Sequence, residues 1–148
     1  MQLLKDKVAI VTGGSRGIGE AIVRKFAESG ATIAFSYISD SSKERAEKIV
    51  SELSANGTNI KAYRSDAASF SDAETFINEV VKDFGRVDIL VNNAGITRDT
   101  LMLRMTEQQW DEVIQTNLKS VFNMTKHILK VMLKQRSGSI INMSSVVG

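Results

Sequence analysis

Residues 7–19 read KVAIVTGGSRGIG, an apolar run that ends in four closely spaced glycines. The run Lys7–Thr12 is rich in β-branched residues and does not alternate with polar ones, as in a strand that is buried on both faces. The apolar side chains that follow have helical spacing, so we predict a helix from Gly17 to Ser29 that Gly30 ends. A glycine-rich turn between a strand and a helix allows a phosphate group to approach the backbone and the helix N-terminus.

The glycines of this turn follow the pattern G-x-x-x-G-x-G, at Gly13, Gly17 and Gly19. The pattern differs from the G-x-G-x-x-G of many dinucleotide-binding proteins, and it is not a P-loop because no Gly-Lys-Ser/Thr follows. A plain strand-to-helix turn is the alternative interpretation. The flanking strand and helix favour dinucleotide binding, because a pyrophosphate then lies against the N–H groups of the first helical turn.

Short apolar runs alternate with longer amphipathic ones along the rest of the chain. We predict four further strands, at Thr32–Ser36, Ile60–Arg64, Val87–Val91 and Ser139–Met143. We predict helices over 41–55, 71–84 and 106–135, the last two opened by capping boxes at Ser71–Glu74 and Thr106–Gln109. Helical crossovers join parallel strands, so the predicted fold class is α/β, a doubly wound parallel sheet of five strands.

Composition and charge narrow the class of protein. The 148 residues fit one domain, 1–148, with the 43% hydrophobic and 24% charged residues of ordinary globular proteins. A net charge of +2 gives no indication of a nucleic-acid partner, and the lack of cysteine excludes disulfides and thiolate metal sites. No apolar run reaches membrane-spanning length and the first residues do not resemble a signal peptide, so we expect a cytoplasmic protein without a membrane partner or a bound metal.

The residues after the second predicted strand indicate which dinucleotide binds. Proteins that bind NAD commonly place a carboxylate there to hold the ribose 2′-hydroxyl group. This chain has Ser36, Tyr37 and Ser39 instead, and Asp40 is expected to begin the next helix. Arg16 can pair with a 2′-phosphate, unless it is only a solvated loop charge, and the hydroxyl groups can add hydrogen bonds. We therefore favour NADP (NADPH) over NAD as the cofactor.

With these residues in place, the chain resembles the short-chain dehydrogenase/reductase family over its whole length. The motifs that carry the resemblance are Thr12-Gly13-x-x-x-Gly17-x-Gly19, Asp66, Asn92-Asn93-Ala94-Gly95, Asn117 and Ser144-Ser145. Each motif follows a predicted strand or lies in the long helix, where doubly wound folds bind ligands. The resemblance narrows to bacterial members that reduce 3-oxoacyl thioesters on acyl carrier protein with NADPH, in fatty-acid biosynthesis. The residues that carry this narrower resemblance are 92–99, 103–105, 116–118 and 145–148.

The resemblance implies a role for each of these positions in binding the cofactor. The residues that would line its phosphates and ribose are Gly13, Gly14, Ser15, Arg16, Ile18 and Tyr37. Asp66 would meet the adenine through its side chain, and Ala67 through its backbone. Asn93 and Gly95 would pass behind the adenosine and nicotinamide riboses.

The resemblance also implies two catalytic positions. Asn117 would hold a proton-relay water through its backbone carbonyl, unless it marks only a helix kink or a polar surface position. Ser145 would donate a hydrogen bond to the substrate carbonyl, on which hydride transfer builds negative charge. Ser144 is its rival, because adjacent residues of a strand point to opposite faces. Both serines would otherwise serve only to cap the end of a strand.

The family places its proton donor in a Tyr-x-x-x-Lys motif after the fifth strand. The two tyrosines of this chain, Tyr37 and Tyr63, do not belong to such a motif. We therefore expect the 148 residues to be part of a longer enzyme and to be inactive by themselves. The alternatives are a non-catalytic dinucleotide-binding module, and a reductase of another carbonyl substrate such as a sugar or a steroid.

Other side chains of the long predicted helix have plainer interpretations. His127 is expected to be a surface or packing residue. Core packing, or the helix pair through which this family dimerises in a homo-oligomer, would explain Trp110, Val113, Ile114, Leu118 and Val121. We expect the intact protein to be a tetramer, a dimer of dimers. A solvated face, or a docking site for the acidic carrier protein, would explain Lys126, Lys130, Lys134 and Arg136.

Overall fold

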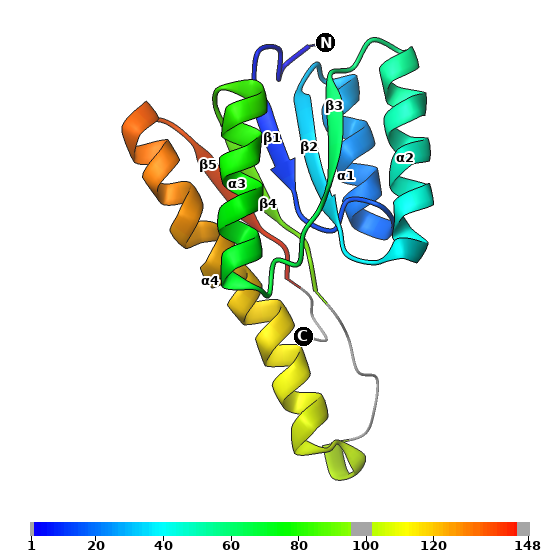
Figure 1. The fold of residues 1–148 in the computed structure, drawn as a ribbon, viewed down its shortest axis with the longest axis vertical. Helices are drawn as coiled ribbons and strands as arrows, with labels where there is room; N and C mark the ends of the chain where they lie inside the picture. The colour runs from blue at the N-terminus through cyan, green and yellow to red at the C-terminus, as the bar shows by residue number, and fades with distance from the viewer. Residues whose placement is uncertain (1, 96–101, 145–148) are drawn as a thin grey trace.

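The computed structural model describes residues 2–95 and 102–144, over which strands alternate with helices (Figure 1). The strands are β1 Val8–Val11, β2 Thr32–Tyr37, β3 Ile60–Arg64, β4 Ile89–Asn92 and β5 Ser139–Asn142. The helices are α1 Gly17–Glu28, α2 Asp40–Ala55, α3 Phe70–Phe84 and α4 Glu107–Gln135, with a 3-10 helix η1 at Met102–Arg104. Each predicted strand and helix is present, with ends that differ by at most two residues.

The strands form one parallel sheet in the order β3-β2-β1-β4-β5. Ile10 of β1 lies opposite Ala34 of β2 on one side and opposite Leu90 of β4 on the other. The chain therefore builds outward from β1 in one direction through β2 and β3, and then returns to build through β4 and β5. This arrangement confirms the predicted doubly wound α/β fold and places its topological switch point between the carboxyl ends of β1 and β4. Such sheets bind ligands there, and we refer to this place as the crevice.

The inner strands β1, β2 and β4 are buried on both faces of the sheet, whereas the edge strand β5 is largely exposed. Helices α1 and α2 cover one face, and α3 and α4 cover the other (Figure 1). Alternate residues of β1 point to the two sides: Val8 and Ile10 pack toward α3 and α4, whereas Ala9 and Val11 pack toward α1 and α2. Burial on both faces explains why β1 and β4 read as continuous apolar runs.

The helix N-termini show where local sequence patterns hold and where they mislead. The capping box predicted for α4 is confirmed: the Thr106 side chain accepts from the Gln109 N–H, and the Gln109 side chain accepts from the Thr106 N–H. The capping box predicted at Ser71–Glu74 is wrong. Helix α3 begins earlier, at Phe70, because the Ser69 hydroxyl accepts a hydrogen bond from the Asp72 N–H at 3.3 Å.

Helix α4 has 29 residues and its first turns extend beyond the sheet (Figure 1). The residues that it buries against the rest of the protein are Ser120, Asn123, Met124, Ile128 and Met132. Of the two interpretations of Trp110 and Leu118, core packing is wrong, because their side chains are 52% and 63% exposed, and the helix-pair interface stays a prediction. None of the described helices has the length and apolar character that crossing a membrane requires.

His127 is a packing residue, as one of the two interpretations predicts. Its ring contacts Phe70 edge-on, with 4.4 Å between the ring centroids, and its side chain is only 12% exposed. The fold brings Glu74 of α3 to within 3.7 Å of its Nδ1 atom.

Candidate functional site: a dinucleotide crevice

The glycine-rich turn leaves β1 at the crevice between β1 and β4, and close approach explains its glycines. A Cβ atom on Gly19 would lie 2.1 Å from the carbonyl oxygen of Gly13, and one on Gly14 would lie 2.7 Å from the Cβ of Phe35. Gly13 itself has φ of +65°, in the left-handed region. The turn is therefore compact, and its backbone is accessible to a ligand at the point where α1 begins.

The N-terminus of α1 differs from those of the other described helices. The side chains of Ser39, Ser69 and Thr106 cap α2, α3 and α4, whereas the residue that precedes α1, Arg16, makes no capping hydrogen bond. The first N–H groups of a helix require acceptors from outside the helix and carry its positive dipole end. A pyrophosphate supplies such acceptors, so the residues present fit a dinucleotide in this crevice.

Thr12 joins the glycine-rich turn to the end of β4. Its hydroxyl oxygen accepts hydrogen bonds from the N–H groups of Asn93 and Ala94, at 3.0 and 2.9 Å, and donates to the Val91 carbonyl at 3.4 Å. The Asn93 side-chain amide donates to the carbonyls of Thr12 and Gly13, both at 3.2 Å. The structure thus brings together Gly13 and Asn93, two of the predicted cofactor contacts, and shows that the Asn93 amide fixes the turn.

The hydroxyl groups at the end of β2 serve the protein backbone. The Ser36 hydroxyl accepts a hydrogen bond from the Gly13 N–H at 3.1 Å, and Ser36 is buried. The Ser39 hydroxyl caps α2 by accepting from the Ser42 N–H. Both groups that were predicted to bind a 2′-phosphate, Ser36 and Ser39, therefore already hold backbone N–H groups. Tyr37, the last residue of β2, is half-buried.

Charged side chains lie near the end of β2, where the sequence predicts binding of a 2′-phosphate. Asp40 begins α2, as predicted, and pairs with Arg64 from the end of β3, which offsets its negative charge. Arg16 is exposed beside the turn. Arg45 of α2, which sequence reasoning missed, donates to the carbonyl of Ser15 at 3.0 Å and so anchors the turn from the side of α2.

The loop between β3 and α3 places Asp66 and Ala67 at the same edge of the sheet. Asp66 accepts a hydrogen bond from the Ala68 N–H at 2.9 Å, and its own N–H donates to the Asp72 carboxylate at 3.1 Å. Ala67 is buried, and its carbonyl accepts from the side-chain amide of Asn123 on α4 at 2.9 Å. Sequence reasoning missed Asn123, although an asparagine on an otherwise apolar helix face is a recognisable signal.

The two predicted residues nearest the reacting end lie together. A Cβ atom on Gly95 would lie 2.9 Å from the Asn117 side-chain oxygen, so this side chain rests against the backbone that follows β4. Ile18, in the first turn of α1, is 64% exposed. Ser144 is the last described residue and is exposed, and Ser145 lies outside the described residues.

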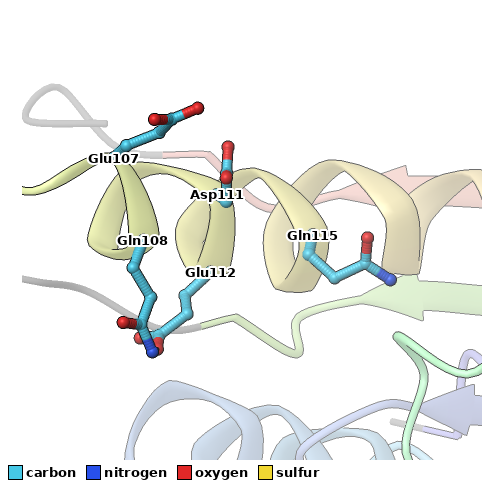
Figure 2. A pocket seen from close by; sticks show the side chains of 5 residues that line it. All are labelled: Glu107, Gln108, Asp111, Glu112 and Gln115. Carbon is cyan, nitrogen blue, oxygen red and sulfur yellow. The ribbon is translucent and has the colours of Figure 1, made fainter.

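A separate surface hollow runs along the first turns of α4, beyond the edge of the sheet. Its lining residues are Glu107, Gln108, Asp111, Glu112 and Gln115 (Figure 2). Glu107 and Asp111 point to one side of the helix, and Gln108 and Glu112 to the other. Its acidic lining does not suit an anionic cofactor, so the dinucleotide crevice is the stronger candidate site.

Comparison with known families agrees with this geometry. A model of the short chain dehydrogenase family matches residues 7–148, so the chain belongs to this family of oxidoreductases. It is 52% identical over 142 residues to the 3-oxoacyl-(acyl-carrier-protein) reductase FabG of Staphylococcus aureus strain N315, covering 96% of this chain and 57% of that protein. The 3-oxoacyl-(acyl-carrier-protein) reductase FabG of Thermotoga maritima is 44% identical, and the match covers 98% of this chain and 58% of that protein. The chain therefore spans under two thirds of each of these relatives.

Solved structures show the same fold. Blue fluorescent protein from a metagenomic library, crystallised in complex with NADPH, is similar with a TM-score of 0.88 and 38% identity, covering 99% of this chain and 58% of that chain. A short-chain dehydrogenase/reductase variant from Serratia marcescens has a TM-score of 0.88 and 33% identity, covering 97% of this chain and 57% of that chain. Both structures therefore support the short-chain dehydrogenase fold for this chain.

Proposed function

We propose that the protein, at its full encoded length, is a cytoplasmic reductase of 3-oxoacyl thioesters on acyl carrier protein, with NADPH as its cofactor. The observation that carries the cofactor assignment is the compact glycine-rich turn in front of α1, the described helix that has no side-chain cap. Identity of 52% to a 3-oxoacyl-(acyl-carrier-protein) reductase over 142 residues supports the substrate class.

The charges at the end of β2 support NADPH over NADH. Asp40 would repel a 2′-phosphate if it were unpaired, but Arg64 pairs with it. Arg16 offers a planar guanidinium group that suits bidentate pairing with a phosphate. We therefore assign Arg16 as the main determinant of the preference for NADPH.

Bound NADPH supplies the hydride for the reaction. The chain would position the nicotinamide ring of the cofactor through Gly95 and Asn117, which lie together after β4, where this ring is expected. Asn117 is proposed to hold a proton-relay water through its carbonyl. Ser145 is proposed to donate a hydrogen bond to the substrate carbonyl, where negative charge develops.

The test follows NADPH absorbance in the full-length protein with acetoacetyl thioesters of acyl carrier protein, alongside simple ketones and sugars. We expect oxidation of NADPH with the thioesters and much slower oxidation with the other carbonyl compounds.

The preference for NADPH is tested at Arg16. Arg16→Met should lower kcat/KM with NADPH by about tenfold or more and leave kcat/KM with NADH nearly unaffected. Lys25→Met, at the exposed far end of α1, is the matched control and should leave kcat/KM unchanged with NADPH and with NADH. Binding of NADPH without turnover of any carbonyl compound would instead support a non-catalytic module.

We also propose that the basic end of α4 docks the acyl carrier protein. The exposed cations there are Lys126, Lys130, Lys134 and Arg136. Complementary charge raises the rate of encounter between protein partners. Arg136→Glu should raise KM for acetoacetyl-carrier protein several-fold while KM for an uncharged acetoacetyl thioester stays the same. An equal rise for both substrates would contradict docking.

A further inference from the structure

Asn123 is a polar residue on the face of α4 that packs against the body of the protein. The side chain is completely buried, as are those of Met124 and Ile128 nearby. Its Nδ2 atom donates to the Ala67 carbonyl at 2.9 Å, while its Oδ1 atom is buried with no hydrogen-bond partner among the described residues. Burying an amide that is only half satisfied opposes folding. Packing alone therefore does not explain an asparagine at this position.

The carbonyl that Asn123 holds belongs to the loop that carries Asp66. This loop, residues 65–69, is fixed on its other side by a hydrogen bond from the Ser65 N–H to the Tyr37 carbonyl, at 3.0 Å. Within the loop, the Asp66 carboxylate accepts from the Ala68 N–H at 2.9 Å. The backbone at Ala67 is thus held from β2 and from α4, and its placement determines where the Asp66 carboxylate points.

The hydrogen bond between Asn123 and Ala67 is shielded from solvent. Asn123 and Ala67 are themselves nearly inaccessible to solvent. Water competes poorly for a hydrogen bond in such surroundings, so the bond holds the carbonyl in a fixed position.

We infer that Asn123 is a positioning residue for the adenine end of the dinucleotide. It does not touch the cofactor; it fixes the Ala67 backbone and, through it, the Asp66 carboxylate. The inference rests on the proposed function, since it requires a dinucleotide whose adenine lies beside Asp66 and Ala67. It adds a residue of α4 to those that determine cofactor affinity.

The test compares three ligands on the full-length protein by isothermal titration calorimetry: NADPH, adenosine 2′,5′-bisphosphate, and reduced nicotinamide mononucleotide. Asn123→Leu keeps the approximate shape of the side chain and removes the donor. We expect it to weaken NADPH and the bisphosphate by the same factor, about five- to tenfold, as loss of one buried hydrogen bond allows. The mononucleotide, which has no adenine, should bind with unchanged affinity.

Gln135→Leu is the matched control. Gln135 also lies on α4 and its side-chain amide also holds backbone, accepting from the Val87 N–H at 2.9 Å and donating to the Val87 carbonyl at 2.7 Å. These contacts lie at the start of β4, at the opposite edge of the sheet from the crevice. We expect Gln135→Leu to lower the melting temperature and to leave the affinity for all three ligands unchanged.

A second variant, Asn123→Ser, has a side chain too short to reach the Ala67 carbonyl. It replaces Asn123→Leu in the same titrations if Asn123→Leu does not fold. The inference is overturned if a folded Asn123 variant binds the bisphosphate as tightly as the wild type does, or if the mononucleotide weakens by the same factor. If the wild type binds neither NADPH nor the bisphosphate, both the proposed function and the inference are wrong. If the wild type binds both and the Asn123 variants match it, only the inference is wrong.

Discussion

The hydroxyl group of Thr12 connects the two strands that border the crevice. Thr12 is 1% exposed and accepts two backbone N–H groups from the segment after β4. Thr12→Val keeps the shape of the side chain but leaves these donors without an acceptor, which should cost about 2 kcal/mol of unfolding free energy. Chemical denaturation measures this loss. Thr12→Ser keeps the hydroxyl group and is the control; if it destabilises as much as Thr12→Val, the hydrogen bonds are not the cause.

At this scale the sequence predicts which residues reach the crevice better than it predicts what they do there. The glycines of the turn and Asn93 lie where the motifs place them. The hydroxyl of Ser36, in contrast, accepts from Gly13 in place of a ligand, because the fold brings β2 alongside the turn. Contacts such as Arg45 to Ser15 and Asn123 to Ala67 join residues that are 30 and 56 positions apart, and no local pattern specifies them.

Asp88, just before β4, gives the stability of the sheet a dependence on pH. Burial opposes ionisation of its carboxylate, but hydrogen bonds from Arg86 and from the Val8 N–H outweigh this effect and lower its pKa. A lowered pKa stabilises the fold above the unfolded-state value, about 3.9, and the contribution is lost as the pH falls through the folded-state value. Asp88→Asn should therefore lower the unfolding free energy by about 1 to 2 kcal/mol at neutral pH.

Denaturation curves at a series of pH values check this prediction. The difference between wild type and Asp88→Asn should stay constant above about pH 5 and shrink below about pH 4, where the unfolded chain takes up a proton at Asp88 more readily than the folded protein does. Asp111→Asn, at an exposed position of α4, is the control and should show no comparable dependence. A difference that persists unchanged in acid would show that Asp88 acts through its shape and not through its charge.

The C-terminus of α4 contains an unfavourable backbone conformation. Arg136 caps the helix with φ of +62° and ψ of +28°, in the left-handed region that side chains with a Cβ disfavour. Arg136→Gly should raise the unfolding free energy by about 0.5 to 1 kcal/mol, seen as a higher denaturation midpoint. Arg136→Ala also removes the charge but keeps the Cβ, and it should bring no such gain. Equal stabilisation by both variants would assign the effect to the charge.

At the scale of the whole molecule, the order of strands and helices can be predicted from the sequence, but what each helix surface contacts cannot. Alternating strand and helix patterns predict the doubly wound sheet, because parallel strands require helical crossovers that are right-handed. The same helical spacing was compatible with a core or an interface for Leu118, and only the packed structure shows it 63% exposed. A periodic apolar pattern shows that a helix has an apolar face, but not what that face contacts.

The exposed face of α4 leads to a prediction about assembly. Its apolar side chains Leu118, Phe122, Leu129 and Leu133 are 43% to 74% exposed and share one side of the helix. Their spacing of four, seven and four residues reads the same in both directions. Two antiparallel copies would therefore pair Leu118 with Leu133 and Phe122 with Leu129 about a twofold axis, as an isologous interface requires.

Charge at the start of the same helix disfavours a parallel arrangement. A parallel pair would place the acidic first turns of the two copies, at Glu107, Asp111 and Glu112, side by side, whereas the antiparallel pair keeps them apart. We propose that the full-length protein is a homo-oligomer built on this pairing. Phe122→Glu combined with Leu129→Glu should shift it toward smaller species in sedimentation velocity, because each copy would bring two buried like charges into the interface. Glu47→Lys with Lys48→Glu, on the exposed side of α2, is the control and should sediment as the wild type does. An unchanged sedimentation coefficient for the α4 variant would place the interface elsewhere on the molecule.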